Sequence, residues 1–142
     1  MGIKFVALIV SLGALWDGFT TFRGLADLFD LVTVSKVNPF QFSFALVVTM
    51  VVFGFVIATH LIWSFTSDDL VTLVLKIAWV LCFAVDFYTS LVGTRYYVFN
   101  DDIDTPAKAM GLLLVTFLVS ASSILLSRLL LAKDIRGRPY LY

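Results

Sequence analysis

Four long stretches of apolar residues limit the folds that are open to this chain of 142 residues. They cover roughly residues 3–29, 40–65, 70–98 and 108–132, and each is long enough to cross the ~30 Å hydrocarbon layer of a bilayer as a helix. Hydrophobic residues make up 61% of the chain and charged residues only 14%, which is too apolar for a soluble domain of this size. The sequence therefore predicts an all-α integral membrane protein, a four-helix bundle that forms a single transmembrane domain over residues 1–142.

Charge and composition exclude several classes of function. Ten basic residues balance ten acidic residues, so a nucleic acid is not an expected partner. Cys82 and His60 are each the only residue of their type, which excludes an intramolecular disulfide and a Cys/His metal site. We find no nucleotide-binding loop, zinc-protease motif or nucleophile elbow. The sequence thus predicts a protein that is not an enzyme and that carries no metal and no cofactor.

One polar pattern, D-x-x-T-[ST]-x-x-G, occurs twice, once in the first apolar stretch and once in the third. The two copies are Asp17, Thr20, Thr21 and Gly24, and Asp86, Thr89, Ser90 and Gly93. Positions i, i+3, i+4 and i+7 share one face of an α-helix. Each copy therefore predicts a stripe made of a carboxylate, two hydroxyl groups and a glycine on one side of a membrane helix.

The pattern belongs to a larger repeated unit. Asn38-Pro39 precedes the second apolar stretch and Thr105-Pro106 precedes the fourth, and both pairs are typical of an N-cap followed by proline at the first helical position. The halves, about residues 1–66 and 67–135, each contain helix, loop and helix. An even number of spans per unit makes both copies point the same way across the membrane, so the bundle is predicted to consist of two parallel helical-hairpin repeats.

The first apolar stretch also has features of a secretory signal peptide. Lys4 precedes the apolar run, and Ser11-Leu12-Gly13 offers small residues for cleavage. We favour a membrane helix, because the polar stripe that follows Gly13 is matched in the third stretch, which cannot be a signal peptide.

Basic residues near the helix ends indicate the orientation. One side would carry Lys4, Arg128, Lys133, Arg136 and Arg138, and the other Arg23, Lys36, Arg95 and Lys108. This bias favours both termini on the cytoplasmic side of a cell (inner) membrane. The basic tail from Arg136 to Tyr142 is expected to rest on anionic lipid or to bind a soluble partner.

The two aspartates are the candidate functional residues. If Asp17 and Asp86 lie at similar depth and face each other or a shared axis, their carboxylates would line a path for a proton or a cation. Thr20, Thr21, Thr89 and Ser90 would add the oxygen ligands that hard cations prefer. In the alternative interpretation each carboxylate lies near the membrane surface, bonded to a hydroxyl or an arginine, and Gly24 and Gly93 only allow close packing.

Small residues at helical spacing predict further packing surfaces. The fourth stretch has a stripe of Thr116, Ser120, Ser123 and Ser127, and the second stretch has Gly54 and Ala58. Small side chains let helix backbones approach closely inside a membrane. We therefore expect a tight bundle and a homo-oligomer, with helix packing a more natural role for the hydroxyl stripe than a pore lining.

Arg23, Asp27 and Asp30 form a charged face at the end of the first stretch. Such a run at a helix end usually faces solvent, where an Arg23–Asp27 pair contributes only tenths of a kcal/mol. A vestibule or a docking surface for a partner is the alternative.

Two functions fit these observations. The leading hypothesis is a small multi-pass membrane protein that oligomerises and forms or contributes to a proton or cation path along the Asp/Thr stripes. The competing hypothesis is a membrane anchor, scaffold or regulatory subunit that conducts nothing and uses its polar stripes to assemble with a membrane or soluble protein partner.

Overall fold

The computed structural model of the chain describes residues 2–31, 38–67 and 69–131, and its secondary structure in these ranges is helical. The helices are α1 (Gly2–Leu28), α2 (Pro39–Ile57), α3 (Thr59–Ser64), α4 (Leu70–Phe99) and α5 (Pro106–Leu131). All but the short α3 are long and apolar enough to cross a membrane. The predicted tail interaction of residues 136–142 lies outside the described residues.

Local side-chain chemistry fixes where the helices begin and end. The side chain of Asn38 accepts a hydrogen bond from the backbone N–H of Phe40 at 3.0 Å, and Asp69 accepts one from that of Thr72 at 2.8 Å. Both satisfy an amide at a helix start that has no partner within the helix. Helix α4 ends at Phe99 and is followed by Asn100, whose φ of 48° is left-handed, a conformation that asparagine tolerates better than most residues. The cap predicted at Asn38 is confirmed.

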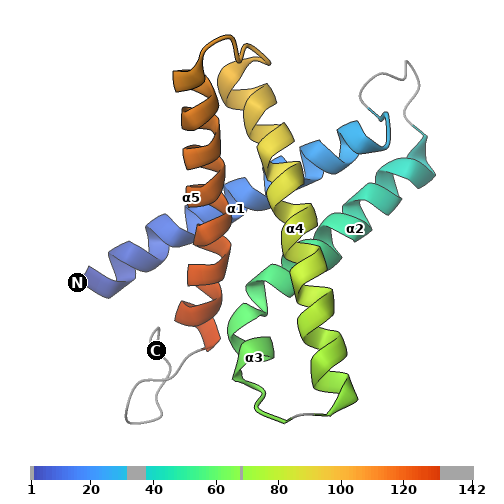
Figure 1. Cartoon of the computed structure of the whole chain (residues 1–142), viewed down its shortest axis with the longest axis vertical. Helices are drawn as coiled ribbons and strands as arrows, with labels where there is room; N and C mark the ends of the chain where they lie inside the picture. The colour runs from blue at the N-terminus through green and yellow to red at the C-terminus, as the bar shows by residue number, and fades with distance from the viewer. Residues whose placement is uncertain (1, 32–37, 68, 132–142) are drawn as a thin grey trace.

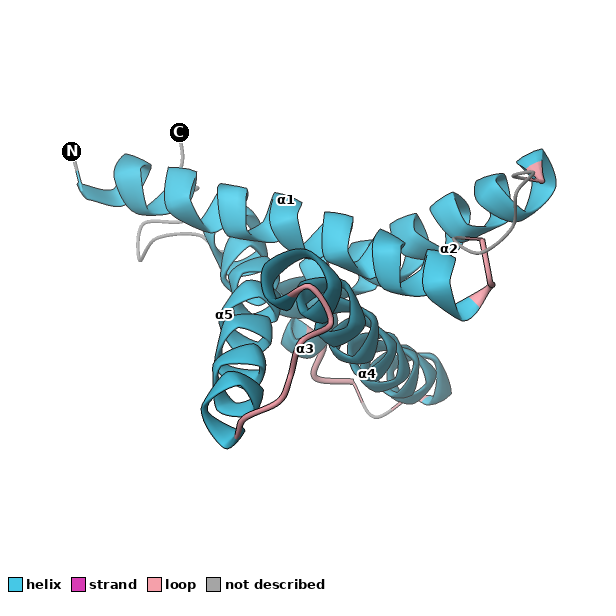
Figure 2. Cartoon of the chain, turned by 90° about the horizontal axis from the view of Figure 1, so that it is seen from above, coloured by secondary structure: helices cyan, strands magenta, loops and turns pink. Residues whose placement is uncertain are grey.

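The helices form two hairpins that cross each other. In Figure 1, α4 and α5 run side by side, and α1 passes across both of them at a steep angle. Figure 2 shows the same arrangement from above, with α1 lying across α4 and α5 rather than alongside them. Helix α1 packs against α4, α5 and α2. One face of α1 is therefore covered by three other helices, while residues such as Leu12 and Leu15 on its other side are exposed.

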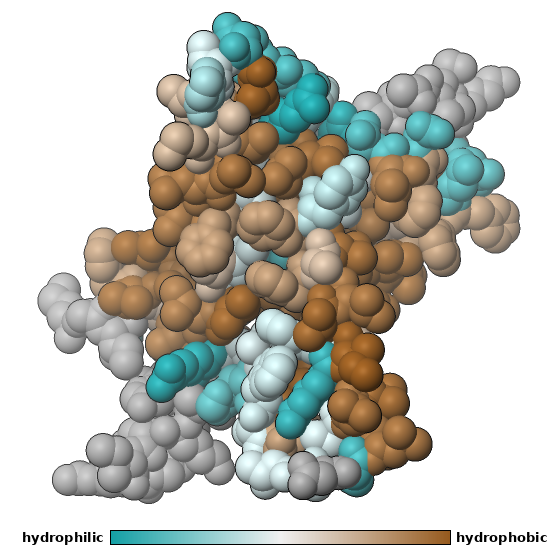
Figure 3. Space-filling view, in the orientation of Figure 1, coloured by the Kyte–Doolittle hydropathy of each residue, from teal (hydrophilic) through white to brown (hydrophobic). Residues whose placement is uncertain are grey.

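The molecule is apolar outside and polar inside. Figure 3 shows a broad hydrophobic band around the middle, with hydrophilic residues gathered towards its upper and lower ends. Large side chains such as Leu15, Leu81 and Phe117 are more than half exposed. Among the described residues, by contrast, more polar than apolar side chains are buried. A water-soluble protein shows the opposite distribution, whereas hydrocarbon solvates such a surface well.

The second apolar stretch is not one continuous helix over residues 40–65. Helix α2 ends at Ile57, and α3 resumes at Thr59 after a break at Ala58. Hydrogen bonds from side chains stabilise the backbone around this break. The Thr59 hydroxyl donates to the carbonyl of Val56 and accepts from the Trp79 indole, and Ser127 accepts from the backbone N–H of His60 at 2.8 Å. Hydropathy alone does not show such an interruption, because the residues on both sides of the break are apolar.

Candidate functional site

The two polar stripes meet where α1 crosses α4. A Cβ atom added to Gly24 would lie 2.6 Å from the Cα of Thr89, and one added to Gly93 would lie 2.8 Å from the Cα of Thr20. Carbon atoms do not approach this closely without a bond, so each position requires glycine. The two contacts are reciprocal, since each glycine of one pattern lies on the first threonine of the other.

A chain of hydrogen bonds joins the two carboxylates through this crossing. The Thr21 hydroxyl donates to Asp86 Oδ1 at 2.7 Å, and the Ser90 hydroxyl donates to Asp17 Oδ1 at 2.8 Å. The two hydroxyl oxygens lie 2.9 Å apart. All four side chains are fully buried. These contacts are reciprocal as well, because each aspartate is bonded by the second hydroxyl of the other stripe.

Helix α5 provides further hydrogen-bond donors to Asp17 but none to Asp86 among the described contacts. Ser123 donates to Asp17 Oδ2 at 2.5 Å, and Ser120 donates to Asp17 Oδ1 at 3.3 Å. With Ser90, three hydroxyl groups from two helices surround this carboxylate. Among the described residues, one hydroxyl group, that of Thr21, bonds Asp86, whose Oδ2 is buried without a hydrogen-bond partner. Charge-assisted hydrogen bonds stabilise an ionised carboxylate, so the surroundings favour negative charge on Asp17 over negative charge on Asp86.

The hydrogen-bonded path from Asp86 to Asp17 has one more contact than the two hydroxyl groups can fill with their protons. Its three oxygen–oxygen contacts each need a proton, but Thr21 and Ser90 supply one apiece. If Asp86 is protonated, it donates to Thr21, Thr21 donates to Ser90, and Ser90 donates to Asp17, so that every contact is a hydrogen bond. Reversing all three bonds moves the extra proton to Asp17. The geometry therefore fits a pair of buried carboxylates that share one proton through two hydroxyl groups.

Thr20 and Thr89 have a different role from Thr21 and Ser90. The Thr20 hydroxyl lies 3.0 Å from the carbonyl oxygen of Asp17, and the Thr89 hydroxyl lies 2.8 Å from that of Val85. Both groups bond their own helix, as threonines in apolar helices commonly do. Thr20 also lies 3.2 Å from Ser90. Neither hydroxyl contacts a carboxylate oxygen in the described contacts.

The remaining packing residues divide into two groups. Thr116, Ser120, Ser123 and Ser127 are all buried. The bonds from Ser120 and Ser123 to Asp17 were not foreseen from the sequence, although their spacing on one helix face was visible. Gly54, by contrast, is exposed, and an added Cβ would meet nothing within 4 Å. No described residue therefore packs closely against Gly54, and the packing predicted there stays a prediction.

Arg23 corrects the prediction of a solvated charged face. Its side chain is only 11% exposed and lies 4.0 Å over the ring of Tyr96, while Asp27 is 52% exposed at a distance of 3.5 Å. The aromatic partner comes from α4, which is why the sequence around Arg23 could not show that the arginine is covered.

A scan against protein-family models, a search of curated proteins and a search of solved structures each found no match to this chain.

Proposed function

We propose that this protein is a multi-pass membrane protein that carries protons through the paired aspartates at the crossing of α1 and α4. The observation that supports it best is the buried chain Asp86–Thr21–Ser90–Asp17, in which both ends can hold a proton and both links can pass it on. Ionisable residues inside a membrane segment are costly and commonly belong to a transport path.

A proton fits this site better than a metal cation. The oxygens that would have to bind a cation already lie within 2.9 Å of one another along the chain from Asp86 to Asp17. A sodium or potassium ion would have to displace these hydrogen bonds, whereas a proton completes them. The path is thus proposed to conduct protons by exchange of hydrogen bonds rather than to conduct hydrated ions.

Buried hydroxyl groups extend the polar column in both directions. Thr94 lies one helical turn beyond Ser90 towards the end of α4, and Ser127 lies one turn beyond Ser123 towards the end of α5. The Thr94 hydroxyl is buried without a hydrogen-bond partner. These groups are the proposed continuations of the path towards the two membrane surfaces.

The reciprocal contacts at the crossing support two further parts of the proposal. Exchange of α1 and α4 maps the Gly24–Thr89 contact onto Gly93–Thr20, as expected for an internal repeat of two hairpins related by an approximate two-fold axis. We further propose the inner membrane location with cytoplasmic termini, on the basis of the basic residues near the helix ends.

Proton flux into liposomes tests the function directly. The purified full chain would be reconstituted into vesicles with a pH-sensitive dye inside and a potassium gradient clamped by valinomycin. Wild-type protein is expected to acidify the vesicles, and Asp17→Asn and Asp86→Asn are each expected to reduce the rate at least about tenfold, because neither amide can carry the exchanged proton. Asp104→Asn, in the exposed loop before α5, is the matched control and should retain the flux.

Two outcomes would reject conduction by the aspartates. One is the absence of flux from folded wild-type protein, and the other is undiminished flux in the double variant. Sodium flux that persists when the pH gradient is abolished would instead support a cation path.

A non-conducting membrane subunit is the second candidate. An open apolar groove of about 390 Å³ between α2, α3 and α4, lined among others by Gly54, Ala58 and Leu75, supports it, because a partner helix could pack closely against the exposed glycine. Loss of co-purifying partners or of homo-oligomers in Gly54→Leu, without any proton flux in wild-type protein, would favour this function.

A further inference from the structure

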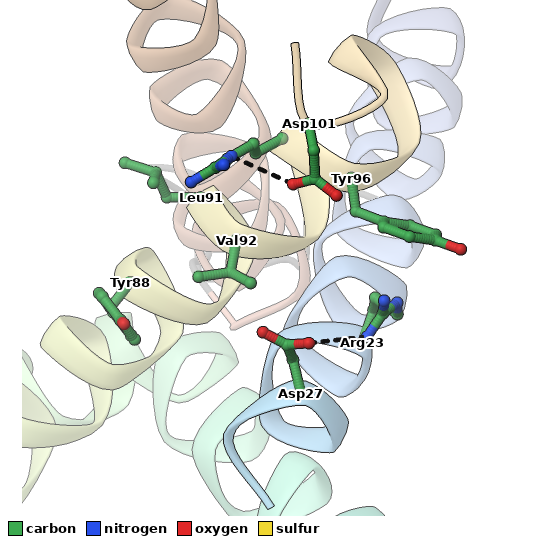
Figure 4. Close-up of a pocket in the computed structure, with 8 residues that line it drawn as sticks. Arg23, Asp27, Tyr88, Leu91, Val92, Tyr96 and Asp101 are labelled. Carbon is green, nitrogen blue, oxygen red and sulfur yellow. Dashed lines mark ion pairs between the residues drawn. The ribbon is translucent and has the colours of Figure 1, made fainter. Parts of the chain in front are cut away.

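A second site lies at the polar end of the crossing, separate from the aspartate pair. Residues of α1, α4 and the loop after α4 enclose an open pocket of about 540 Å³. Figure 4 shows Asp101 on one side of this pocket and Asp27 on the opposite side, with Val92 of α4 between them. The pocket is large enough for a small polar ligand or for the headgroup of a lipid.

Two ion pairs, each formed by an arginine and an aspartate, line the pocket. Arg23 lies 3.5 Å from Asp27, and Arg95 lies 3.1 Å from Asp101. The four charges sum to zero, so the pocket offers both anion-binding and cation-binding groups at one place. A ligand that carries both signs of charge is the chemical complement of such a lining.

Arg23 has a hydrogen-bonding group without a partner. Its Nη1 atom is buried and makes no hydrogen bond, although it lies 3.5 Å from Asp27 Oδ1 as an ion pair. The guanidinium is also held in place over the ring of Tyr96. A phosphate oxygen is a strong acceptor for the N–H groups that such a guanidinium presents to a pocket.

Part of the pocket lining belongs to the membrane-crossing helix α4 and includes the apolar residues Leu91 and Val92. Tyr88, Leu91 and Val92 precede Arg95 and Tyr96 along one face of α4. The same face therefore changes from apolar to charged towards the end of the helix. A lipid has this order of polarity along its length, since its acyl chains lead to a phosphate and then to the headgroup.

We propose that this pocket binds the headgroup of a zwitterionic phospholipid that carries a primary ammonium, with its phosphate at the arginines and its ammonium at Asp27, across the pocket from Asp101. A primary ammonium is a strong hydrogen-bond donor to a carboxylate. The site rests on the proposed membrane location but not on proton conduction, so the two proposals can fail separately.

Native mass spectrometry of the full chain in detergent tests this site. The probes are phosphatidylethanolamine, phosphatidylglycerol and soluble glycerophosphoethanolamine, which has the headgroup but no acyl chains. Wild-type protein is expected to retain phosphatidylethanolamine about tenfold more strongly than either other probe. Arg95→Gln, at a half-exposed position, should weaken its retention about tenfold, and Arg128→Gln, on the exposed surface of α5, should leave it unchanged.

Each contrary result overturns a named part of the proposal. Equal retention of phosphatidylglycerol would exclude recognition of the ammonium, and equal binding of glycerophosphoethanolamine would identify a soluble ligand instead of a lipid. Undiminished retention in Arg95→Gln would exclude the pocket itself. Arg23→Gln, with its helix content checked by circular dichroism, provides a second variant of the phosphate-binding side.

Discussion

Asp17 and Asp86 occupy matching positions in the two helices of one crossing, yet their surroundings differ. Three hydroxyl groups donate to Asp17, and one donates to Asp86. The difference comes from the second helix of each hairpin. Helix α5 directs Ser120 and Ser123 at Asp17, whereas no described residue of α2 bonds Asp86. One copy of the stripe therefore has more hydrogen-bond donors to stabilise a negative charge than the other, and in the proposed path the proton resides more readily on Asp86.

Substitutions of the two glycines should have the largest effect, because they act on the contact that both halves share. Gly24→Ala and Gly93→Ala are each expected to lower the free energy of unfolding by about 1–3 kcal/mol, since the new Cβ would overlap the backbone of the opposing helix. Unfolding in mixed micelles with rising dodecyl sulfate fraction measures this change.

Gly54→Ala is the matched control for both glycines. It adds the same methyl group at an exposed helical position, where it is expected to stabilise the helix by about 0.5–1 kcal/mol. Equal destabilisation at all three positions would show that the crossing contact has no special role.

Substitution of each aspartate by asparagine tests whether the two carboxyl groups differ in protonation. Asp86→Asn resembles the protonated carboxyl group, so we expect a loss of less than about 0.5 kcal/mol. Asp17→Asn places an amide N–H₂ among three hydroxyl donors, and the expected loss is about 1–2 kcal/mol. The same micelle unfolding compares them, and a larger loss for Asp86→Asn would reverse our assignment of charge and proton.

Removal of single hydroxyl groups on α5 should have a smaller effect. Ser123→Ala deletes one donor to Asp17, and we expect a loss of about 0.6 kcal/mol, the average for a hydrogen bond between membrane helices. Thr116→Val removes a buried hydroxyl that has no partner, so its expected effect is near zero or stabilising. Unfolding curves that rank these two variants in the opposite order would contradict the described contacts.

The smallest expected effect is the pH dependence of stability that comes from the cap of helix α4. Hydrogen bonds from the side chain and the backbone N–H of Thr72 lower the pKa of Asp69 below its ordinary value of 3.8. A carboxylate with a lowered pKa stabilises the fold above the ordinary value, and this contribution is lost as the pH falls below it. Stability measured from about pH 5 to about pH 3 should therefore fall more in wild-type protein than in Asp69→Asn.

The other hairpin gives the internal contrast for this test. Helix α2 is capped by Asn38, which does not titrate in this range. An Asn38→Asp variant should acquire a similar dependence on pH, and its absence would show that capping at these exposed helix ends contributes little.

Much of the fold followed from the sequence, since the length of the apolar stretches and the Asn38-Pro39 and Thr105-Pro106 pairs placed the long helices correctly. The spacing of the stripes also indicated that Asp17 and Asp86 each lie on a helix face with two hydroxyl residues and a glycine. It could not show that Ser120 and Ser123 bond Asp17, because contacts between helices depend on the crossing angle and rotation of each helix. The break at Ala58 and the covering of Arg23 by Tyr96 depend on such contacts too.

The bonds between Asp17 and α5 join residues more than 100 positions apart, which has a consequence for biosynthesis. When α1 leaves the ribosome, the serines that will surround its carboxyl group have not yet been made. Placing an aspartate at the centre of a membrane helix costs about 2.5–3.5 kcal/mol during insertion by the translocon. Helix α1 should therefore enter the bilayer with Asp17 in neutral form, or wait beside the insertion machinery until α5 arrives.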